Sequence, residues 1–273
     1  MIVHKFLLLI SLCVFCTSSI AADVRPGVDT YEKTERRLTR VTDGLAFESS
    51  SWIFRSKFNG HLDRRHYNGH RDSVLLVPTS SHPDDLTLIV WFHGLGGFSE
   101  KTFRRVLSQA QEISKEGYSI AIAIPEMPWS INTSTKRSRQ GRVWRRSGDF
   151  SNFILENKAL LASWAIANYG VSINAIRIVV VGHSAGGSAI SSAAVEGGLC
   201  DVQPHAIVWS DASYGRWLGA AWSGCLSESG ITMHLLVRKW DKPHRNAEMF
   251  MKTLKGISPC VKYQVLNRRR WRH

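Results

Sequence analysis

The sequence predicts an α/β protein with a mainly parallel central sheet and helices on both faces. Short apolar runs alternate with longer helical stretches along the chain, which is typical of this fold class. Most of the apolar runs are continuous rather than alternating, as expected for strands that are covered on both faces. One such run leads directly into Gly182-His183-Ser184-Ala185-Gly186 and then into a helix, so a candidate functional turn lies at the end of a buried strand.

The individual elements follow from the same patterns. Strands are expected at Ser73–Val77, Leu86–Phe92, Ser119–Ile124, Ile176–Val181, Ala206–Ser210, Ile231–Val237 and Val261–Leu266. Helices are expected between them at Glu100–Glu116, Asn152–Tyr169, Ser184–Val195 and His244–Lys255. In the second of these helices, the residues at helical spacing that mark its apolar side are Phe153, Leu160, Trp164 and Ala167.

The first residues have the pattern of an export signal. Lys5 supplies a positive start, Phe6–Phe15 is a short apolar run, and Ser18–Ala22 offers small residues for cleavage. Residues 1–22 are therefore predicted to be a signal peptide, and the protein is predicted to be secreted or periplasmic, with no stable membrane span.

The remaining chain is long enough for one core, since it belongs to a sequence of 273 residues with 44% hydrophobic composition. The predicted division is an N-terminal arm with the first strands at 23–72 and the core at 73–273, which includes a basic loop at 129–149. The arginines of that loop lie around Trp144 and could bind an anionic or carbohydrate-like ligand, or the loop could simply be solvated.

Charge and cysteine content limit the partners and the compartment. The formal net charge of +13 favours anionic surroundings, but no nucleic-acid-binding motif accompanies it. Removal of the signal takes away Cys13 and Cys16 and leaves Cys200, Cys225 and Cys260. An exported chain with three thiols can form one disulfide, and the sequence leaves the choice of pair open.

The turn around Ser184 has the order strand, Gly-x-Ser-x-Gly, helix. On such a turn the Ser184 hydroxyl would project above the carboxyl edge of the sheet, and Gly182 and Gly186 would leave room where the two backbones crowd. The amide of Ala185 would face the same point and could stabilise an oxyanion. This arrangement predicts a nucleophilic serine.

A second glycine motif, His93-Gly94-Leu95-Gly96-Gly97, follows the strand that ends at Phe92. A loop in this position is expected to supply the other oxyanion-binding amide. We expect the Leu95 amide to be that donor, with Gly96 as the next candidate. His93 is expected to anchor the loop by a hydrogen bond.

Together, His93–Gly97 and Gly182–Gly186 resemble the α/β-hydrolase family, and the resemblance extends over the chain from Val74 onwards. The layout of "LLVPTSSHPDDLTLIVWFHGLGG" followed by "GHSAGG" is also similar to that of secreted polyester depolymerases and feruloyl-type esterases. The resemblance implies an α/β-hydrolase fold and a catalytic triad in the chain order serine, acid, histidine. It implies chemistry that needs neither a cofactor nor a metal.

The family's order puts the acid after the seventh strand and the histidine after the eighth. Asp241 has the usual position of the acid, and Asp211, at the end of the preceding strand, is the alternative. An aspartate at either place could instead cap a helix or form a turn. His273 has the usual position of the base, whereas His244, three residues after Asp241, is the alternative. An incomplete site remains a further possibility.

These residues predict an exported serine hydrolase that cleaves an ester or amide through an acyl-enzyme. The alternative is a catalytically impaired protein of the same fold that binds an anionic or carbohydrate polymer. Residues expected to contact the substrate flank the two glycine motifs or follow the strand that ends at Ser210; they are Gly94, Gly96, His183, Tyr214 and Trp217.

Overall fold

The computed structural model describes residues 51–58, 71–94, 100–125, 144, 146–239, 241–254 and 260–266. The expected signal peptide, residues 1–22, and most of the arm at 23–72 lie outside the described residues. Most of the expected basic loop at 129–149 also lies outside them.

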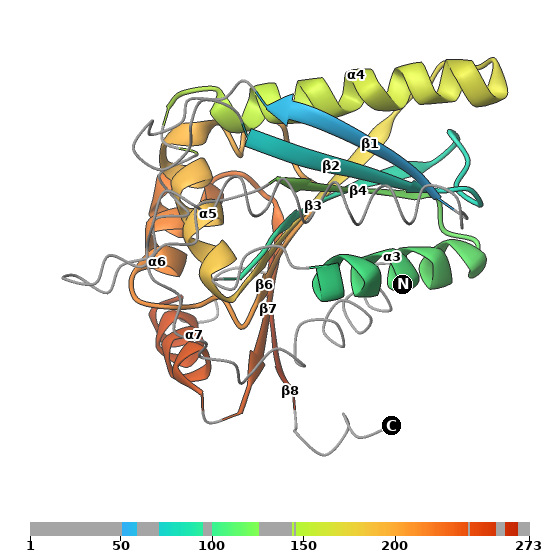
Figure 1. Cartoon of the computed structure of the whole chain (residues 1–273). Helices are drawn as coiled ribbons and strands as arrows, with labels where there is room; N and C mark the ends of the chain where they lie inside the picture. Colours follow the sequence, from blue (N-terminus) through green and yellow to red (C-terminus); the bar gives the residue numbers. More distant parts are fainter. Residues whose placement is uncertain are drawn as a thin grey trace.

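The centre of the fold is an eight-stranded sheet in the order β1-β2-β4-β3-β5-β6-β7-β8 (Figure 1). β2 runs antiparallel to both of its neighbours, and all other neighbouring strands are parallel, so the predicted mainly parallel sheet is confirmed. The strands are β1 (Ser51–Phe58), β2 (Arg71–Pro78), β3 (Leu86–Phe92), β4 (Ile120–Pro125), β5 (Ile176–His183), β6 (Ala206–Ser210), β7 (Thr232–Arg238) and β8 (Val261–Leu266). The edge strand β1 has no counterpart among the individually expected strands, because its sequence mixes polar and apolar residues.

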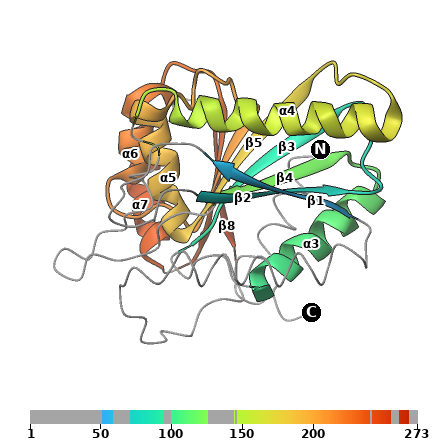
Figure 2. The same ribbon diagram turned by 45° about the horizontal axis from the view of Figure 1, so that its top comes forward.

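Helices cover both faces of this sheet, as predicted (Figures 1 and 2). The α-helices are α3 (Glu100–Lys115), α4 (Asp149–Tyr169), α5 (Gly187–Ser192), α6 (Trp217–Ala221) and α7 (Lys242–Thr253). The expected helix Ser184–Val195 is a run of three types: the 3₁₀ turn η3 (Ser184–Gly186), then α5, then the π-helical turn η4 (Ala193–Gly197). α6 and the π-helical turn η5 (Trp222–Leu226) that follows it were not expected.

The buried side chains form two layers, one on each face of the sheet. Along β3, Leu88 and Val90 belong to the layer under α4, α5, α6 and α7, whereas Ile89 and Trp91 belong to the layer under α3. Because successive side chains of a strand point to opposite faces, a continuously apolar strand supplies both layers. This is why the runs that predicted the strands show no alternation.

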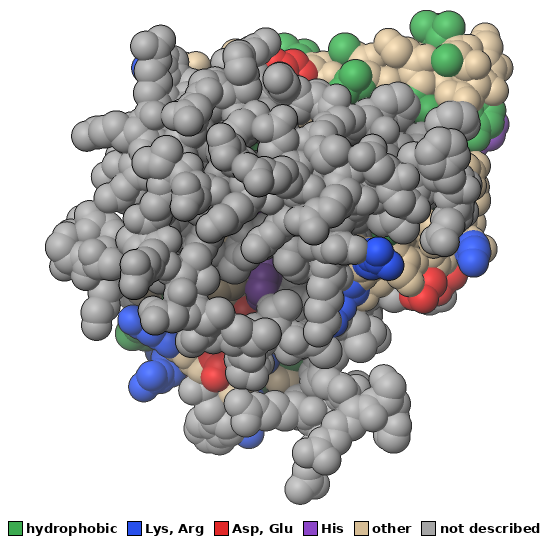
Figure 3. Space-filling model, viewed as in Figure 1, with side chains coloured by type: hydrophobic (Ala, Val, Ile, Leu, Met, Phe, Trp, Pro, Cys, Tyr) green, Lys and Arg blue, Asp and Glu red, His purple; other side chains and the backbone are tan. Residues whose placement is uncertain are grey.

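The long helix α4 is apolar on more than one side. Its buried side faces the sheet through Phe150, Phe153, Ile154, Leu161 and Trp164. Ala167, which we expected on this side, is exposed. Leu155 and Ile166 are each 60% exposed, and hydrophobic side chains are visible at the surface over α4 (Figure 3).

Trp144 corrects one expectation about the basic loop. Its side chain is fully buried, and its ring lies 5.4 Å from that of Phe92, 5.7 Å from that of Phe150 and 5.5 Å from that of Phe153. The burial of a large aromatic surface among three rings makes Trp144 part of the core rather than a ligand-binding side chain.

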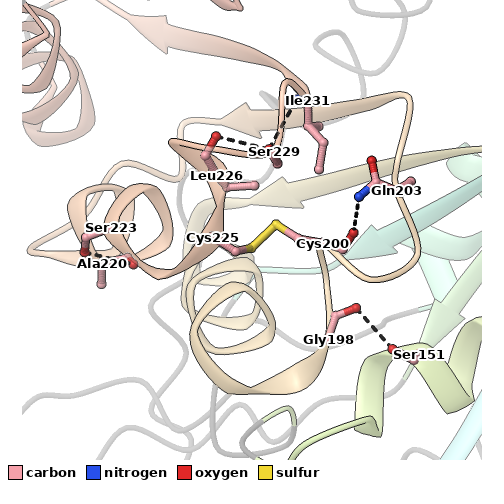
Figure 4. The surroundings of a disulfide bond; sticks show 10 residues. All are labelled: Ser151, Gly198, Cys200, Gln203, Ala220, Ser223, Cys225, Leu226, Ser229 and Ile231. Carbon is pink, nitrogen blue, oxygen red and sulfur yellow. Dashed lines mark hydrogen bonds between the residues drawn. A yellow bond between two sulfur atoms is a disulfide. The ribbon is translucent and has the colours of Figure 1, made fainter.

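A disulfide joins Cys200 to Cys225, which settles the pairing that the sequence left open. Cys200 follows η4 and Cys225 lies in η5, so the bond ties together the segments that continue from α5 and α6 (Figure 4). Cys260 is a free thiol.

Removal of this disulfide should destabilise the fold. Replacing Cys200 and Cys225 by serine removes a cross-link between positions that are 25 residues apart. The unfolded chain gains entropy as a result, which predicts a loss of about 3.5 kcal/mol of unfolding free energy. Urea unfolding followed by tryptophan fluorescence measures this loss. Cys260→Ser is the control and should stay close to wild type; equal midpoints for wild type and the double variant would contradict the prediction.

Candidate active site

The carboxyl ends of four parallel strands lie at one edge of the sheet. Phe92 pairs with Gly182, His183 with Ser210, and Ser210 with Leu236, so β3, β5, β6 and β7 end almost level. The chain leaves β3 for β4 on one side and β5 for β6 on the other, which makes the space beside the β3 and β5 ends a topological switch point. Ligands bind at such points in open α/β sheets.

Ser184 lies on the turn that leaves β5 at this switch point. Its φ of 50° is in the left-handed region, although it is not a glycine. A conformation of this kind costs of the order of 1–3 kcal/mol and persists only where the surroundings enforce it. The strained turn between β5 and α5 is the geometry that presents a nucleophilic serine above a sheet.

Two of the glycines around Ser184 are required by close backbone contacts. A Cβ on Gly186 would lie 2.3 Å from the carbonyl oxygen of Phe92, and a Cβ on Gly187 would lie 2.3 Å from that of Ala212. These approaches press the start of the helical run against the ends of β3 and β6. They explain why small residues follow the serine.

Replacing Gly186 by alanine should therefore strongly destabilise the protein. The obstructing atom is a backbone oxygen, which cannot move away as a flexible side chain could, and overpacking of this kind costs about 3 kcal/mol or more. Chemical denaturation measures the loss. Gly219→Ala in α6 is the matched control, because a Cβ there meets nothing within 4 Å; a Gly186→Ala variant as stable as this control would refute the packing argument.

The start of the expected oxyanion loop lies against the serine turn. A Cβ built on Gly94 would lie 3.2 Å from His183 Nδ1 and 3.4 Å from Ser184 Cβ. His93 is buried, and its Nδ1 lies 2.8 Å from the Gly94 carbonyl oxygen, a hydrogen-bond distance. Leu95 and Gly96, the expected amide donors, lie outside the described residues. Ala185 is buried directly after Ser184.

His183 presents a neutral ring to this site. Burial, with the nearby charges of Arg238 and His93, lowers the pKa of His183 to about 3. The imidazole is therefore uncharged at neutral pH.

Tyr214, expected as a substrate contact, lies close to Ser184. The Tyr214 side chain lies near enough to Ser184 for this serine to lower the pKa of the phenol, and the Tyr214 ring packs edge-on against Trp217 at 5.9 Å between centroids. Burial and the nearby Asp211 carboxylate raise the pKa of Tyr214, so the phenol is protonated at neutral pH. The sequence carried no signal for the contact with Ser184.

The two candidate acids meet at one arginine. Asp211 is 1% exposed and has a φ of 48°; its Oδ1 accepts a 2.8 Å hydrogen bond from the Arg238 amide, and its Oδ2 accepts one from Arg238 Nε. Asp241 Oδ2 lies 3.1 Å from the same Nε. Burial raises the pKa of Asp211, whereas the bonds from Arg238 act in the opposite direction.

Asp241 does not use its carboxylate as a helix cap. It occupies the N-cap position of α7 but makes no side-chain capping hydrogen bond, and its carboxylate lies against Arg238 instead. The capping role that the sequence allowed for this aspartate is thus absent from the structure.

Of the two candidate bases, His244 lies among the described residues. His244 is buried in the first turn of α7, where its Nε2 lies 3.4 Å from Glu248 Oε1 and its ring stacks on Tyr263 at 6.5 Å between centroids. These contacts place its ring between α7 and β8. His273 lies outside the described residues. Within the described ranges, no group of three or more His, Cys, Asp or Glu residues could hold a metal ion.

Comparisons with known proteins find similarity only to solved structures, and at low sequence identity. No protein-family model and no curated protein sequence matches the chain. Solved structures that are similar include fungal esterases from Rhizomucor miehei (TM-score 0.48, 15% identity, 92% of this chain and 84% of that chain covered). A ferulic acid esterase (0.46, 11%, 80% and 90%) and esterase B from Lactobacillus rhamnosis (0.42, 12%, 87% and 81%) are also similar.

The topology of the sheet and the turn after β5 identify the fold. The strand order, the single antiparallel strand β2 inside the sheet and the strained serine turn after β5 occur together. With these features, the chain has the α/β-hydrolase fold.

Proposed function

We propose that this protein is a serine hydrolase that cleaves a carboxylic ester, or an amide, through an acyl-enzyme. The observation that carries the proposal is the strained Ser184 turn, which lies against Gly94 at the switch point of the sheet, with two aspartates following the neighbouring strands. A hydroxyl, an amide-rich loop and carboxylates are the parts that acyl transfer requires at one place.

The mechanism assigns each residue one task. His273 takes the proton of Ser184 as its oxygen attacks the substrate carbonyl, and Asp241 holds the imidazole in the correct tautomer. The amides of Leu95 and Ala185 stabilise the oxyanion. The protonated histidine then gives its proton to the leaving group, and water releases the acyl group by the same steps.

We assign Asp241 rather than Asp211 as the acid. Both oxygens of Asp211 accept hydrogen bonds from Arg238, and its side chain is almost completely buried. The Asp241 side chain is 31% exposed and makes no capping bond. A carboxylate at the surface of the site is better placed to accept a bond from an imidazole that arrives from the segment after β8.

We further propose that the protein is exported. The disulfide between Cys200 and Cys225 supports an oxidising compartment, where such bonds persist. The signal-like pattern of residues 1–22 supports the same route. In the part of the chain that the structure describes, no helix is both long and apolar enough to cross a membrane.

Hydrolysis of p-nitrophenyl acetate and butyrate by the purified, oxidised chain tests the activity. We expect saturable turnover and a burst of p-nitrophenol where deacylation is slower than acylation. The p-nitroanilide of a small acyl group is tested in the same way as the two esters. If the protein hydrolyses none of these three substrates faster than buffer alone does, the proposed function is refuted.

A further inference from the structure

Arg238 is the point at which the ends of two strands and both candidate acids meet. It is the last residue of β7, and its amide and Nε bind the two oxygens of Asp211, which follows β6. The same Nε lies 3.1 Å from Asp241 Oδ2 in the segment that leads to α7. One side chain therefore sets the distance between the two carboxylates.

The guanidinium of Arg238 is also a charge within the site. The ionisable groups that its field reaches are Asp211, Asp241, His183 and Tyr214. Two carboxylates side by side would otherwise repel each other, and the Arg238 charge offsets that repulsion. Any imidazole that binds Asp241 must therefore act beside this positive charge.

We propose that Arg238 is a positioning residue of the active site, which fixes the Asp241 carboxylate relative to the buried Asp211, so that an imidazole bound to Asp241 acts next to one positive charge. This role rests on the proposed function. Asp211 is then a structural support for Arg238, and the strained backbone of Asp211 serves to direct its carboxylate at the end of β7.

The geometry requires arginine rather than lysine. An arginine side chain has fixed, planar donors, so the single Nε–H can bind Asp211 while the guanidinium charge pairs with Asp241. A lysine at this place keeps the charge but provides a single flexible ammonium group. Charge and placement can therefore be separated with two substitutions, Arg238→Lys and Arg238→Met.

The test is the pH dependence of kcat/KM for p-nitrophenyl butyrate. For Arg238→Met, we expect the acidic limb to move to higher pH by about one unit, because loss of a nearby positive charge favours the protonated base. We also expect kcat to fall about tenfold as Asp241 loses its fixed position. For Arg238→Lys, the limb should stay in place while kcat falls.

Arg177→Met is the matched control. Arg177 makes an ion pair of 2.9 Å with Asp85 at the opposite end of β5 from Ser184, and its loss should change neither the limb nor kcat. Thermal melting of each variant measures any loss of folded protein.

The outcomes separate the two proposals. If wild type hydrolyses the ester and both Arg238 variants retain its pH profile and kcat, the role of Arg238 is overturned and the proposed function stands. If Arg238→Met does not fold, Arg238→Lys decides: a wild-type kcat overturns the role, and a reduced kcat with an unmoved limb supports it. If wild type itself is inactive, the proposed function and this role fail together.

Discussion

Replacing Ser184 by alanine should lower kcat for p-nitrophenyl butyrate by about 10⁴-fold or more while leaving the fold intact. The side chain that forms the acyl-enzyme is lost, and only binding and the oxyanion amides remain to assist attack by water. Alanine retains the Cβ, so the strained turn at φ 50° keeps the same backbone constraint. Thermal melting should therefore show little change.

The matched control for this substitution is Ser192→Ala. Ser192 is the last residue of α5 and is half-buried, so its loss tests a serine on the same helical run without touching the turn. We expect near wild-type kcat. If Ser184→Ala keeps more than about a tenth of the wild-type rate, Ser184 is not the nucleophile and the acyl-enzyme mechanism is wrong.

Replacing Asp241 by asparagine should lower kcat by about 10⁴-fold, since an amide favours the wrong tautomer of the catalytic histidine. The side chain is 31% exposed, so stability should change by less than about 1 kcal/mol. The comparison is Asp211→Asn, which removes the charge from a buried partner of Arg238. It should cost about 1–3 kcal/mol of stability and reduce kcat far less.

The two aspartate variants must be measured in parallel, by steady-state kinetics and by urea unfolding. The reverse pattern, with Asp211→Asn inactive and stable and Asp241→Asn active, would make Asp211 the acid. Asp241 would then act only through its ion pair with Arg238.

Much of the fold was predictable from the sequence because burial on both faces leaves a clear pattern. Most of the strands from β2 to β8 contain a continuous apolar run, and each of these strands overlaps the range in which it was expected. The turn at Ser184 was predictable because close backbone approaches at Gly186 and Gly187 require glycine in the sequence itself. A turn whose backbone contacts require glycine can therefore be recognised from the sequence alone.

The remaining features depend on contacts between distant segments. Arg238 carries no motif, and its role is visible only when the ends of β6 and β7 are level and Asp211 points across. The closeness of Tyr214 to Ser184 has the same origin. Trp144 lay in a basic stretch that suggested a ligand, but it packs against Phe92 in the core.

Labelling with a fluorophosphonate probe, followed by mass mapping of the modified peptide, tests the central claim most directly. An activated serine beside oxyanion-binding amides reacts with such a probe irreversibly, whereas an ordinary serine does not. We predict that the label will be found on Ser184, with one probe molecule bound per chain. No labelling, or labelling of another residue while Ser184 stays unmodified, would contradict the account.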